Sequence, residues 1–307
     1  MNKSKVIWIS CIFCLVLIPA IALFGNQALR CMYSEKLTYE PFDADETPST
    51  AYLPVLVYHH FQEESPTDNS LYVSKDSFDD QMRALKENGY SAVTAQQLID
   101  FVKMGIPLPE NPILITMDDG YTSNLNIAAP ILEAYDMQAI IFVIGISAGE
   151  EKDPVSGNVF YYPRFAWAEA LPWLEKGVLD IQCHSYDMHR KAADGYSIRD
   201  GMLRAEGESA EAYSEALKQD FDIYRSILKR EYGTEMCALA FPFGYHSEEL
   251  IAESKKNGIK LTFTTKVDGN YVTVGKPDSL HRMNRINVYD TTTGDNLIWF
   301  IEHYDTK

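Results

Sequence analysis

The sequence has few cysteines and few basic residues, and each shortage excludes a class of protein. Five of its 307 residues are cysteine, too few for a small scaffold held together by disulfides. Lys and Arg total 27 against 44 Asp and Glu, a net charge of −17, which argues against nucleic acid as a partner. Internal repeats and low-complexity tracts are also lacking. What remains is enough chain for one large globular domain.

Only one long apolar run is present, and it lies near the N-terminus. Val6–Phe24 contains no charge, and Lys3 and Lys5 precede it. A run of this length can cross a bilayer, and no clean small-x-small cleavage site follows it. We therefore expect one transmembrane helix, with a cleaved signal peptide as the second choice. The positive-inside tendency places the rest of the chain outside the cytoplasm, as a single-pass membrane protein or, failing that, a secreted one.

This run sets the expected division of the chain. Residues 1–26 form a membrane anchor or signal segment, 27–51 a polar, acidic linker, and 52–307 the folded domain. Within that domain strand-like and helix-like patterns alternate, which predicts an α/β fold of βα units with parallel strands. The pattern alone allows an α/β barrel or an open doubly wound sheet. Strands are expected at 53–60, 91–95, 111–119, 138–145, 179–185, 236–244 and 260–265, and helices at 77–90 with a serine cap, 96–105, 126–136, 165–176, 208–231 and 247–258.

Polar residues follow several of these strands where they end. In both candidate folds the chemistry lies at the carboxyl ends of the parallel strands. Four such ends carry polar or turn-forming groups, which predicts a site there. They are Tyr58-His59-His60, Asp118-Asp119, His184 with His189, and Pro242-Phe243-Gly244.

The segment ITMDDGY ends a buried strand on two adjacent carboxylates, which repel each other. One carboxylate with His184 and His189 has the composition of a site for zinc, iron, cobalt or nickel. The two histidines are five residues apart, which fits a loop and not an H-E-x-x-H helix. Hydrogen-bonded loop histidines are the alternative, less favoured beside two aspartates. A cation on one aspartate would remove the repulsion and leave its neighbour as a base.

A phosphatase with a nucleophilic aspartate is a rival interpretation of this acidic strand end. That pattern requires a second acid two residues after the first, and Gly120 occupies the position. The phosphatase interpretation is therefore weakened.

Taken in order, VLVYHHF, TMDDGYTSN, HSYDMH and AFPFG resemble the motifs of the polysaccharide deacetylases (carbohydrate esterase family 4) from about Tyr52 to Val288. The resemblance implies a distorted (β/α) barrel and metal-dependent removal of N-acetyl groups from N-acetylglucosamine units of a cell-wall or extracellular polysaccharide. It implies zinc as the metal, with cobalt, nickel or iron as alternatives.

By position, the resemblance implies that Asp118 is the catalytic base and that Asp119, His184 and His189 are the metal ligands. It implies that the backbone N–H of Phe243 is the oxyanion donor, at a position where the family has tyrosine.

Two parts of the family pattern are missing. The arginine that supports the base is absent from AFPFG, and Arg282 or Arg285 is a candidate to replace it. The histidine that supplies the catalytic acid has no clear match, and His281 and His303 are only weak candidates. His59 is favoured slightly as a residue that lines the site.

These gaps keep a second function open, a sugar-binding surface protein that retained the fold and lost catalysis. The aromatic segment Phe160–Trp167 is expected to be loop packing, although its rings could also stack on sugars. The complete set of Asp118, Asp119, His184 and His189 favours the enzyme.

Overall fold

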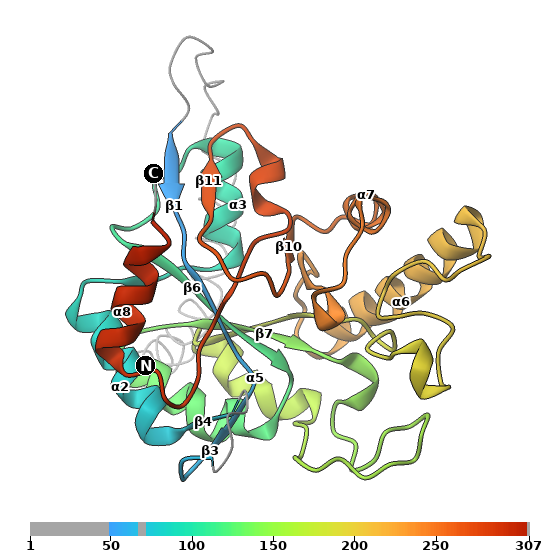
Figure 1. Ribbon diagram of the computed structural model, residues 1–307, viewed down its shortest axis with the longest axis horizontal. Helices are drawn as coiled ribbons and strands as arrows, with labels where there is room; N and C mark the ends of the chain where they lie inside the picture. The colour runs from blue at the N-terminus through green and yellow to red at the C-terminus, as the bar shows by residue number, and fades with distance from the viewer. Residues whose placement is uncertain (1–48, 67–71, 306–307) are drawn as a thin grey trace, which may run out of the picture. The chain divides into compact units, whose positions relative to one another are not determined.

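The fold follows from short apolar runs that are buried on both faces, as parallel strands covered by helices require. A computed structural model describes residues 49–66 and 72–305, and Thr47–Lys307 form one compact unit (Figure 1). The strands are β1 (Thr50–Tyr52), β2 (Val55–Tyr58), β3 (His60–Gln62), β4 (Tyr72–Ser74), β5 (Ser91–Ala92), β6 (Pro112–Asp119), β7 (Ala139–Val143), β8 (Leu179–Cys183), β9 (Ala238–Ala240), β10 (Leu261–Phe263), β11 (Tyr271–Thr273) and β12 (Ile286–Asn287).

Helices alternate with these strands as the sequence pattern predicts. The α-helices are α2 (Lys75–Glu87), α3 (Ala95–Met104), α4 (Ala129–Ala134), α5 (Trp167–Glu175), α6 (Ala210–Glu231), α7 (Glu248–Lys256) and α8 (Gly294–His303). The short helices are η1 (Asn124–Ala128), η2 (Gly145–Ser147), η3 (Ala192–Asp194), η4 (Pro242–Gly244) and η5 (Pro277–Leu280). The sequence pattern predicts that the helix begins at Ser77 and that Ser77 is its N-cap. The observed N-cap lies three residues earlier. It is Ser74, whose side chain accepts a hydrogen bond from the Ser77 N–H.

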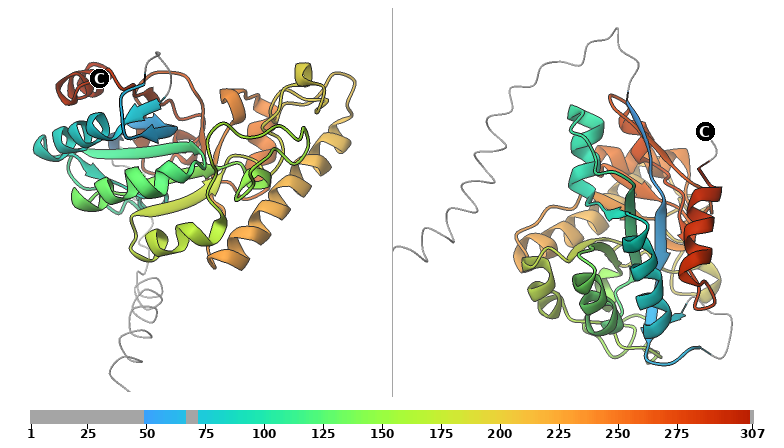
Figure 2. Two further views of the ribbon diagram at one scale, coloured as in Figure 1. Left: turned by 90° about the horizontal axis from the view of Figure 1, so that it is seen from below. Right: turned by 90° about the vertical axis from the view of Figure 1, so that its left-hand side faces the viewer.

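The main sheet is parallel and curled, with the strand order β10-β9-β8-β7-β6-β2-β12 and β5 paired to the start of β6 (Figures 1 and 2). The predicted α/β class and parallel sheet are confirmed. The regular strands form an open, half-barrel sheet whose two edges are β10 and β12. The distorted (β/α) barrel implied by the resemblance takes the form of this curled half-barrel sheet.

Irregular backbone joins the two edges of the sheet. The Met283 N–H donates to the Thr262 carbonyl at 2.8 Å, and the Arg285 N–H donates to the Lys266 carbonyl at 2.9 Å. Directly afterwards β12 pairs with β2, with Ile286 opposite Leu56. The segment 283–287 thus runs from the side of β10 to the side of β2, and it carries Arg285 into the middle of the curl.

Two hydrophobic clusters cover opposite faces of the sheet, because successive strand residues point to opposite faces. On β6, Ile113, Ile115 and Met117 belong to the outer cluster, which buries α2, α4, α6, α7 and α8. Leu114 belongs to the inner cluster, which packs α3 against the other face of the sheet. Both faces of the sheet are therefore filled largely with apolar side chains, and the two aspartates of β6 come at its carboxyl end.

The expectation of a single-pass membrane protein is contradicted. Among the described residues 49–66 and 72–305, no helix is both long enough and apolar enough to span a bilayer. The segment Val6–Phe24, on which that expectation rested, lies outside the described residues, as does most of the expected linker 27–51.

Candidate active site

The inner face of β6 carries Asp118 into the curl of the sheet. Leu114 belongs to the inner cluster, so Thr116 and Asp118, which follow at intervals of two, face the same side. Asp118 is 3% exposed. A carboxylate so deeply buried is costly unless it is paired and hydrogen-bonded.

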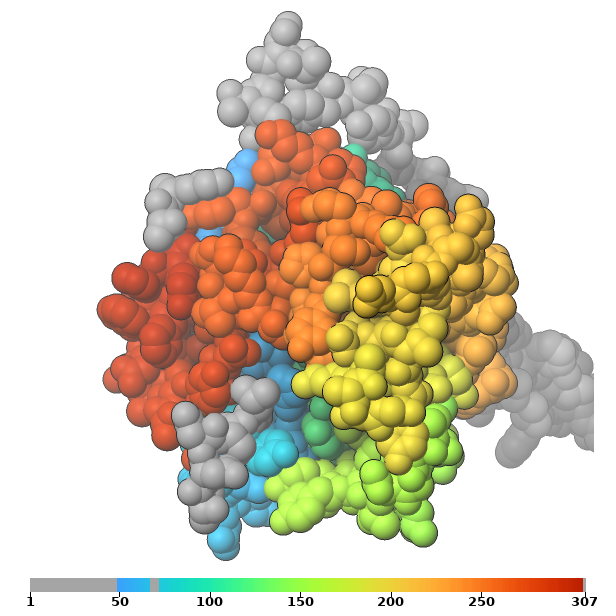
Figure 3. All heavy atoms as spheres, turned by 45° about the vertical axis from the view of Figure 1, so that its right-hand side comes forward, coloured from blue at the N-terminus to red at the C-terminus, as the bar shows by residue number. Residues whose placement is uncertain are grey.

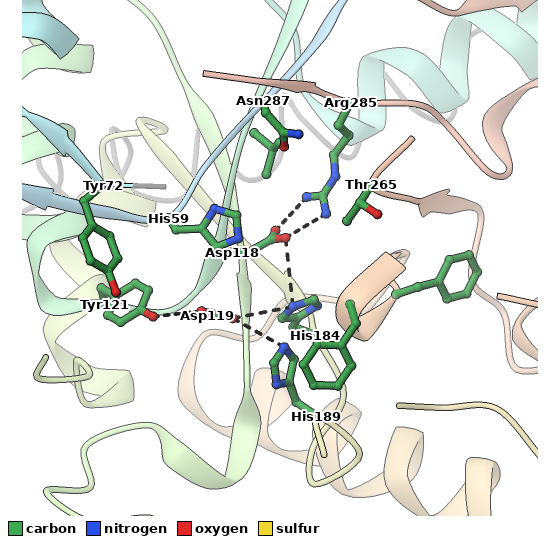
Figure 4. A pocket seen from close by; sticks show the side chains of 13 residues that line it. His59, Tyr72, Asp118, Asp119, Tyr121, His184, His189, Thr265, Arg285 and Asn287 are labelled. Atoms are coloured by element: carbon green, nitrogen blue, oxygen red, sulfur yellow. Dashed lines mark hydrogen bonds and ion pairs between the residues drawn. The ribbon is translucent and has the colours of Figure 1, made fainter. Parts of the chain in front are cut away.

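Arg285 provides that pairing. Its Nη1 and Nη2 donate to Oδ1 and Oδ2 of Asp118, each at 2.7 Å, and its Nε donates to the Thr264 carbonyl at 2.8 Å (Figure 4). The side chain of Arg285 is fully buried. Arg282, the other candidate for the missing arginine, instead forms a surface ion pair with Glu248 at 2.6 Å.

The ion pair sets the charge of Asp118. Burial by itself raises the pKa of the Asp118 carboxyl, but Arg285, followed by His184, acts in the opposite direction. The pKa therefore lies below its ordinary value, and the group is an ionised carboxylate at neutral pH. An ionised carboxylate in a cavity is able to accept a proton.

Asp119 faces differently because the backbone turns at this residue. Its φ is 77°, in the left-handed region, and the next residue, Gly120, has φ 83°. A Cβ on Gly120 would lie 3.0 Å from Cγ1 of Val143, so glycine is required there. The turn separates the side chains of the two aspartates, which explains how they tolerate being neighbours.

Two side chains hold Asp119 in place. The Tyr121 hydroxyl donates to Oδ2 at 3.0 Å, and Nη1 of Arg164 donates to the Asp119 carbonyl. Burial raises the pKa of Asp119, whereas Arg164 and then His189 lower it, and the net shift is strongly downward. Asp119 is thus a fixed, ionised carboxylate.

The two predicted histidines follow β8 and point at Asp119. Nε2 of His184 lies 3.6 Å from Oδ1 of Asp119, and Nε2 of His189 lies 3.8 Å from the same oxygen. The Ala240 carbonyl lies 2.8 Å from Nδ1 of His184, so Nδ1 donates to it and Nε2 presents a lone pair. Burial and the neighbouring His184 lower the pKa of His189 to about 4, which keeps this imidazole neutral.

The loop that carries these histidines is anchored by α6. Asp220 accepts hydrogen bonds from the Tyr186 N–H at 2.8 Å and from the Asp187 N–H at 2.9 Å. Asp220 is itself buried, at 6% exposed. The spacing of five residues between His184 and His189 is therefore maintained by a fixed loop and not by a helix.

These three side chains fit a divalent metal. One ligand atom each from Asp119, His184 and His189 lies within 4.8 Å of the other two. One carboxylate oxygen and two imidazole nitrogens suit zinc and related ions and leave positions free for other ligands.

A cavity of about 460 Å³ opens over this group of residues. Asp118, Asp119, His184, His189 and Phe243 all line it. Figure 3 shows a hollow on this face, with blue and green atoms at its floor between the orange, yellow and light green segments. The volume is within the range typical of small-ligand sites, roughly 300–1,000 Å³.

Phe243 borders the cavity on a turn after β9. Its φ is 60°, a left-handed conformation that is uncommon for a residue other than glycine. Its ring lies 4.3 Å from that of His189, between ring centroids. Backbone strain of this kind often marks functional sites, where the surrounding structure holds it.

The structure separates His59, which was expected to line the site, from His281 and His303, the two weak candidates for the catalytic acid. His59 lines the cavity beside Asp118 (Figure 4), and its buried Nδ1 has no hydrogen-bond partner among the described residues. His303 lies exposed on α8, where it stacks on Trp299. His281 lies 3.4 Å from the Thr262 hydroxyl and does not line the cavity.

The sequence is similar to those of known proteins. The family model for polysaccharide deacetylases matches residues 105–262. The chain belongs to the polysaccharide deacetylase family. The Bacillus subtilis protein YxkH, which carries the name of the same family, is 26% identical over 257 residues, covering 84% of this chain and 78% of its own length.

A second relative carries a substrate in its name. Poly-beta-1,6-N-acetyl-D-glucosamine N-deacetylase of Staphylococcus epidermidis is 23% identical over 276 residues, covering 86% of each chain. A solved de-N-acetylase from Aggregatibacter actinomycetemcomitans superimposes with a TM-score of 0.67 at 22% identity, covering 81% of this chain and 100% of that one. That similarity shows a shared fold. The expectation of an enzyme of the polysaccharide deacetylase class is confirmed.

The matched segment of this polysaccharide deacetylase leaves out several residues that line its cavity, His59 and Arg285 among them. It contains Asp118, Asp119, His184, His189 and Phe243, whereas His59 and Arg285 lie before and after it. The sequence also gives no sign of a role for Arg164, because this residue lies in the segment Phe160–Trp167, which was expected to be loop packing. Only the two arginines of HRMNRINV gave a signal for Arg285, and the sequence could not choose between them.

Proposed function

We propose that this deacetylase is a metal-dependent hydrolase that removes N-acetyl groups from N-acetylglucosamine units of a polysaccharide. One observation carries the proposal. A buried, ion-paired carboxylate, Asp118, has its Oδ2 4.0 Å from Nε2 of His184, next to three convergent metal-ligand side chains. Asp118 can act as a base for the attacking water, and a metal held by the three ligand side chains would supply a Lewis acid for the amide carbonyl in the same cavity.

Asp118 is the proposed base. Arg285 holds both of its oxygens and keeps them ionised, so the carboxylate accepts the proton of the attacking water without rotating. A fixed base costs little reorganisation during the reaction.

Asp119, His184 and His189 are the proposed metal ligands, with zinc first and cobalt, nickel or iron as alternatives. A bound divalent ion would polarise the acetamide carbonyl and lower the pKa of water. The Phe243 N–H is proposed to donate a hydrogen bond to the acetamide carbonyl oxygen. The turn on which Phe243 lies fixes the direction of this N–H. Tyr121 and Arg164 keep Asp119 in position.

His59 is the proposed acid. The amine that leaves must gain a proton, and His59 is the histidine that lines the cavity without belonging to the ligand group. Its position next to Asp118 suits a donor to the nitrogen while the base acts on water. This assignment replaces His281 and His303.

The substrate class is inferred from relatives. Several are named poly-beta-1,6-N-acetyl-D-glucosamine N-deacetylases, and we propose a β-1,6-linked N-acetylglucosamine polymer ahead of β-1,4-linked polymers. The test is acetate release by the purified chain from polymers of each linkage, with zinc, cobalt, nickel or iron added after chelation. Asp118→Asn serves as the control for contaminating activity. Absence of acetate with every polymer and metal would reject the proposal.

A further inference from the structure

A second cavity adjoins the catalytic one. It has a volume of about 580 Å³, and its walls include Gln62, Glu64, Tyr161 and Tyr162. Tyr72 lines both this cavity and the catalytic one, so the two share a wall. Tyr72 therefore lies between the two cavities.

The second cavity has a rigid aromatic base. Tyr162 stacks on His60 with ring centroids 3.8 Å apart and an interplanar angle of 26°, and it contacts Tyr72 edge-on at 5.0 Å. His60 is in turn held by the Ser123 hydroxyl, 2.9 Å from its Nδ1. The expected loop packing is therefore correct for Tyr162.

Tyr161 is different from its neighbour. It is 89% exposed, and its ring stands at 87° to that of Tyr162, with the centroids 4.7 Å apart. An aromatic ring so exposed, on a rigid support and beside a cavity, offers an apolar surface with a hydroxyl at its edge. Packing among residues 49–66 and 72–305 does not account for the position of Tyr161.

The chemistry of the walls indicates what binds. A pyranose has one apolar face of C–H groups, which packs on an aromatic ring, and a rim of hydroxyls, which hydrogen-bond to amide and carboxylate groups. The ring of Tyr161 and the side chains of Gln62 and Glu64 provide both kinds of partner around one cavity. The volume is within the range of roughly 300–1,000 Å³ for small-ligand sites.

We propose that the cavity bounded by Tyr72, Tyr161 and Tyr162 is a sugar subsite. It binds a pyranose ring of the same polysaccharide chain, next to the sugar that is deacetylated. The inference rests on the proposed function for the identity of the polysaccharide. It adds that the enzyme binds more than one sugar of that polysaccharide at a time.

The test compares binding of the β-1,6-linked pentamer of N-acetylglucosamine with binding of the monomer. All proteins carry Asp118→Asn to prevent turnover, and titration calorimetry gives both affinities. The parent should bind the pentamer at least about tenfold more tightly than the monomer, and Tyr161→Ala should reduce that ratio by about tenfold, the scale of one aromatic contact.

Two variants serve as matched controls. Tyr161→Phe keeps the ring and should retain the ratio, and so should Tyr196→Ala, which removes a tyrosine 50% exposed on another loop. Equal affinities for pentamer and monomer in the parent, or an unchanged ratio in Tyr161→Ala, would overturn the subsite. An equal reduction of the pentamer-to-monomer affinity ratio in Tyr196→Ala would also overturn the subsite.

Acetate release by the wild-type chain separates this inference from the proposed function. Binding in the expected pattern without any release of acetate from the pentamer would leave the subsite standing and reject the hydrolase. Acetate release together with a pentamer-to-monomer affinity ratio that is unchanged in Tyr161→Ala would reject the subsite alone.

Discussion

Arg285 donates one hydrogen bond of 2.7 Å to each carboxylate oxygen of Asp118, although 167 positions separate the two residues in the chain. Both side chains are buried. Charge-assisted bidentate bonds of this kind are among the strongest in proteins, and they fix orientation as well as charge. The pair therefore determines at which pH the proposed base is ready to act.

Replacing Arg285 should move the acid limb of the pH profile upward. Arg285 lowers the pKa of Asp118, so in the wild type the carboxylate stays ionised well into acid. In Arg285→Gln the pKa should rise by roughly 1–3 units, the usual effect of removing an adjacent opposite charge. Activity should then be lost at a correspondingly higher pH, as measured from kcat/KM against pH.

The matched control for this change is Arg282→Gln, which removes a surface ion pair with Glu248 and should leave the profile in place. Because breaking a buried pair costs about 3–5 kcal/mol, the folding of Arg285→Gln is checked by thermal unfolding, and Arg285→Lys is measured beside it. If folded Arg285→Gln keeps the acid limb at the wild-type pH, Arg285 does not control the pKa of the catalytic base.

His59→Gln should slow hydrolysis of amides much more than hydrolysis of esters. An amine must be protonated to leave, whereas an aryl oxide leaves without a proton. With an N-acetylglucosamine oligomer, kcat should fall by roughly 10²–10⁴-fold, the usual contribution of a general acid. With an aryl acetate the loss should be far smaller.

His303→Gln is the control for His59, because it removes a histidine exposed on α8. It should change neither reaction. Equal losses on amide and ester in His59→Gln would mean that His59 positions groups and does not donate the proton.

Metal binding should depend on three residues together. Asp119→Asn, His184→Ala and His189→Ala should each lose most of the bound metal, because their ligand atoms converge within 4.8 Å. Asp118→Asn should keep the metal and still lose turnover. Metal content by elemental analysis and kcat are measured on the same preparations. Full metal occupancy in His189→Ala would remove that residue from the site.

Asp220→Asn should weaken metal binding without touching a ligand. Asp220 accepts the Tyr186 and Asp187 N–H groups within the loop between the two histidines, and an amide supplies one acceptor oxygen where the carboxylate supplies two. We expect affinity to fall by roughly 10–100-fold, the usual effect of losing an outer support.

Asp222→Asn is the matched change on the same helix, since Asp222 pairs only with Lys218 and Arg225 among the described residues. Its metal affinity, measured by competition with a chelator, should equal that of the wild type. A similar loss in both variants would point to a general effect of charge on α6.

The sequence predicted most of what depends on neighbours along the chain. The run ITMDDGY is a strand that ends on its two aspartates, and the alternation of strands and helices predicted the parallel sheet. The strand order and the segment 283–287, which joins the sheet edges, depend on contacts between distant parts of the chain, and no local pattern encodes them.

The same distinction applies to single residues of the site. Asp119 and Phe243 owe their directions to left-handed backbone turns, which residue type alone does not announce. His59 was expected at the end of a longer strand, where alternation left its direction open. The structure ends β2 at Tyr58, and His59 then falls in a break before β3.

The distance along the chain between Asp118 and Arg285 has a consequence for biosynthesis. The strands β6, β7 and β8 leave the ribosome well before the segment 283–287, and folding of a nascent chain begins at its N-terminal side. Until the segment 283–287 docks between β10 and β2, Asp118 has no Arg285 to compensate its burial. The nascent chain therefore has to fold its first strands with this carboxylate still open to water.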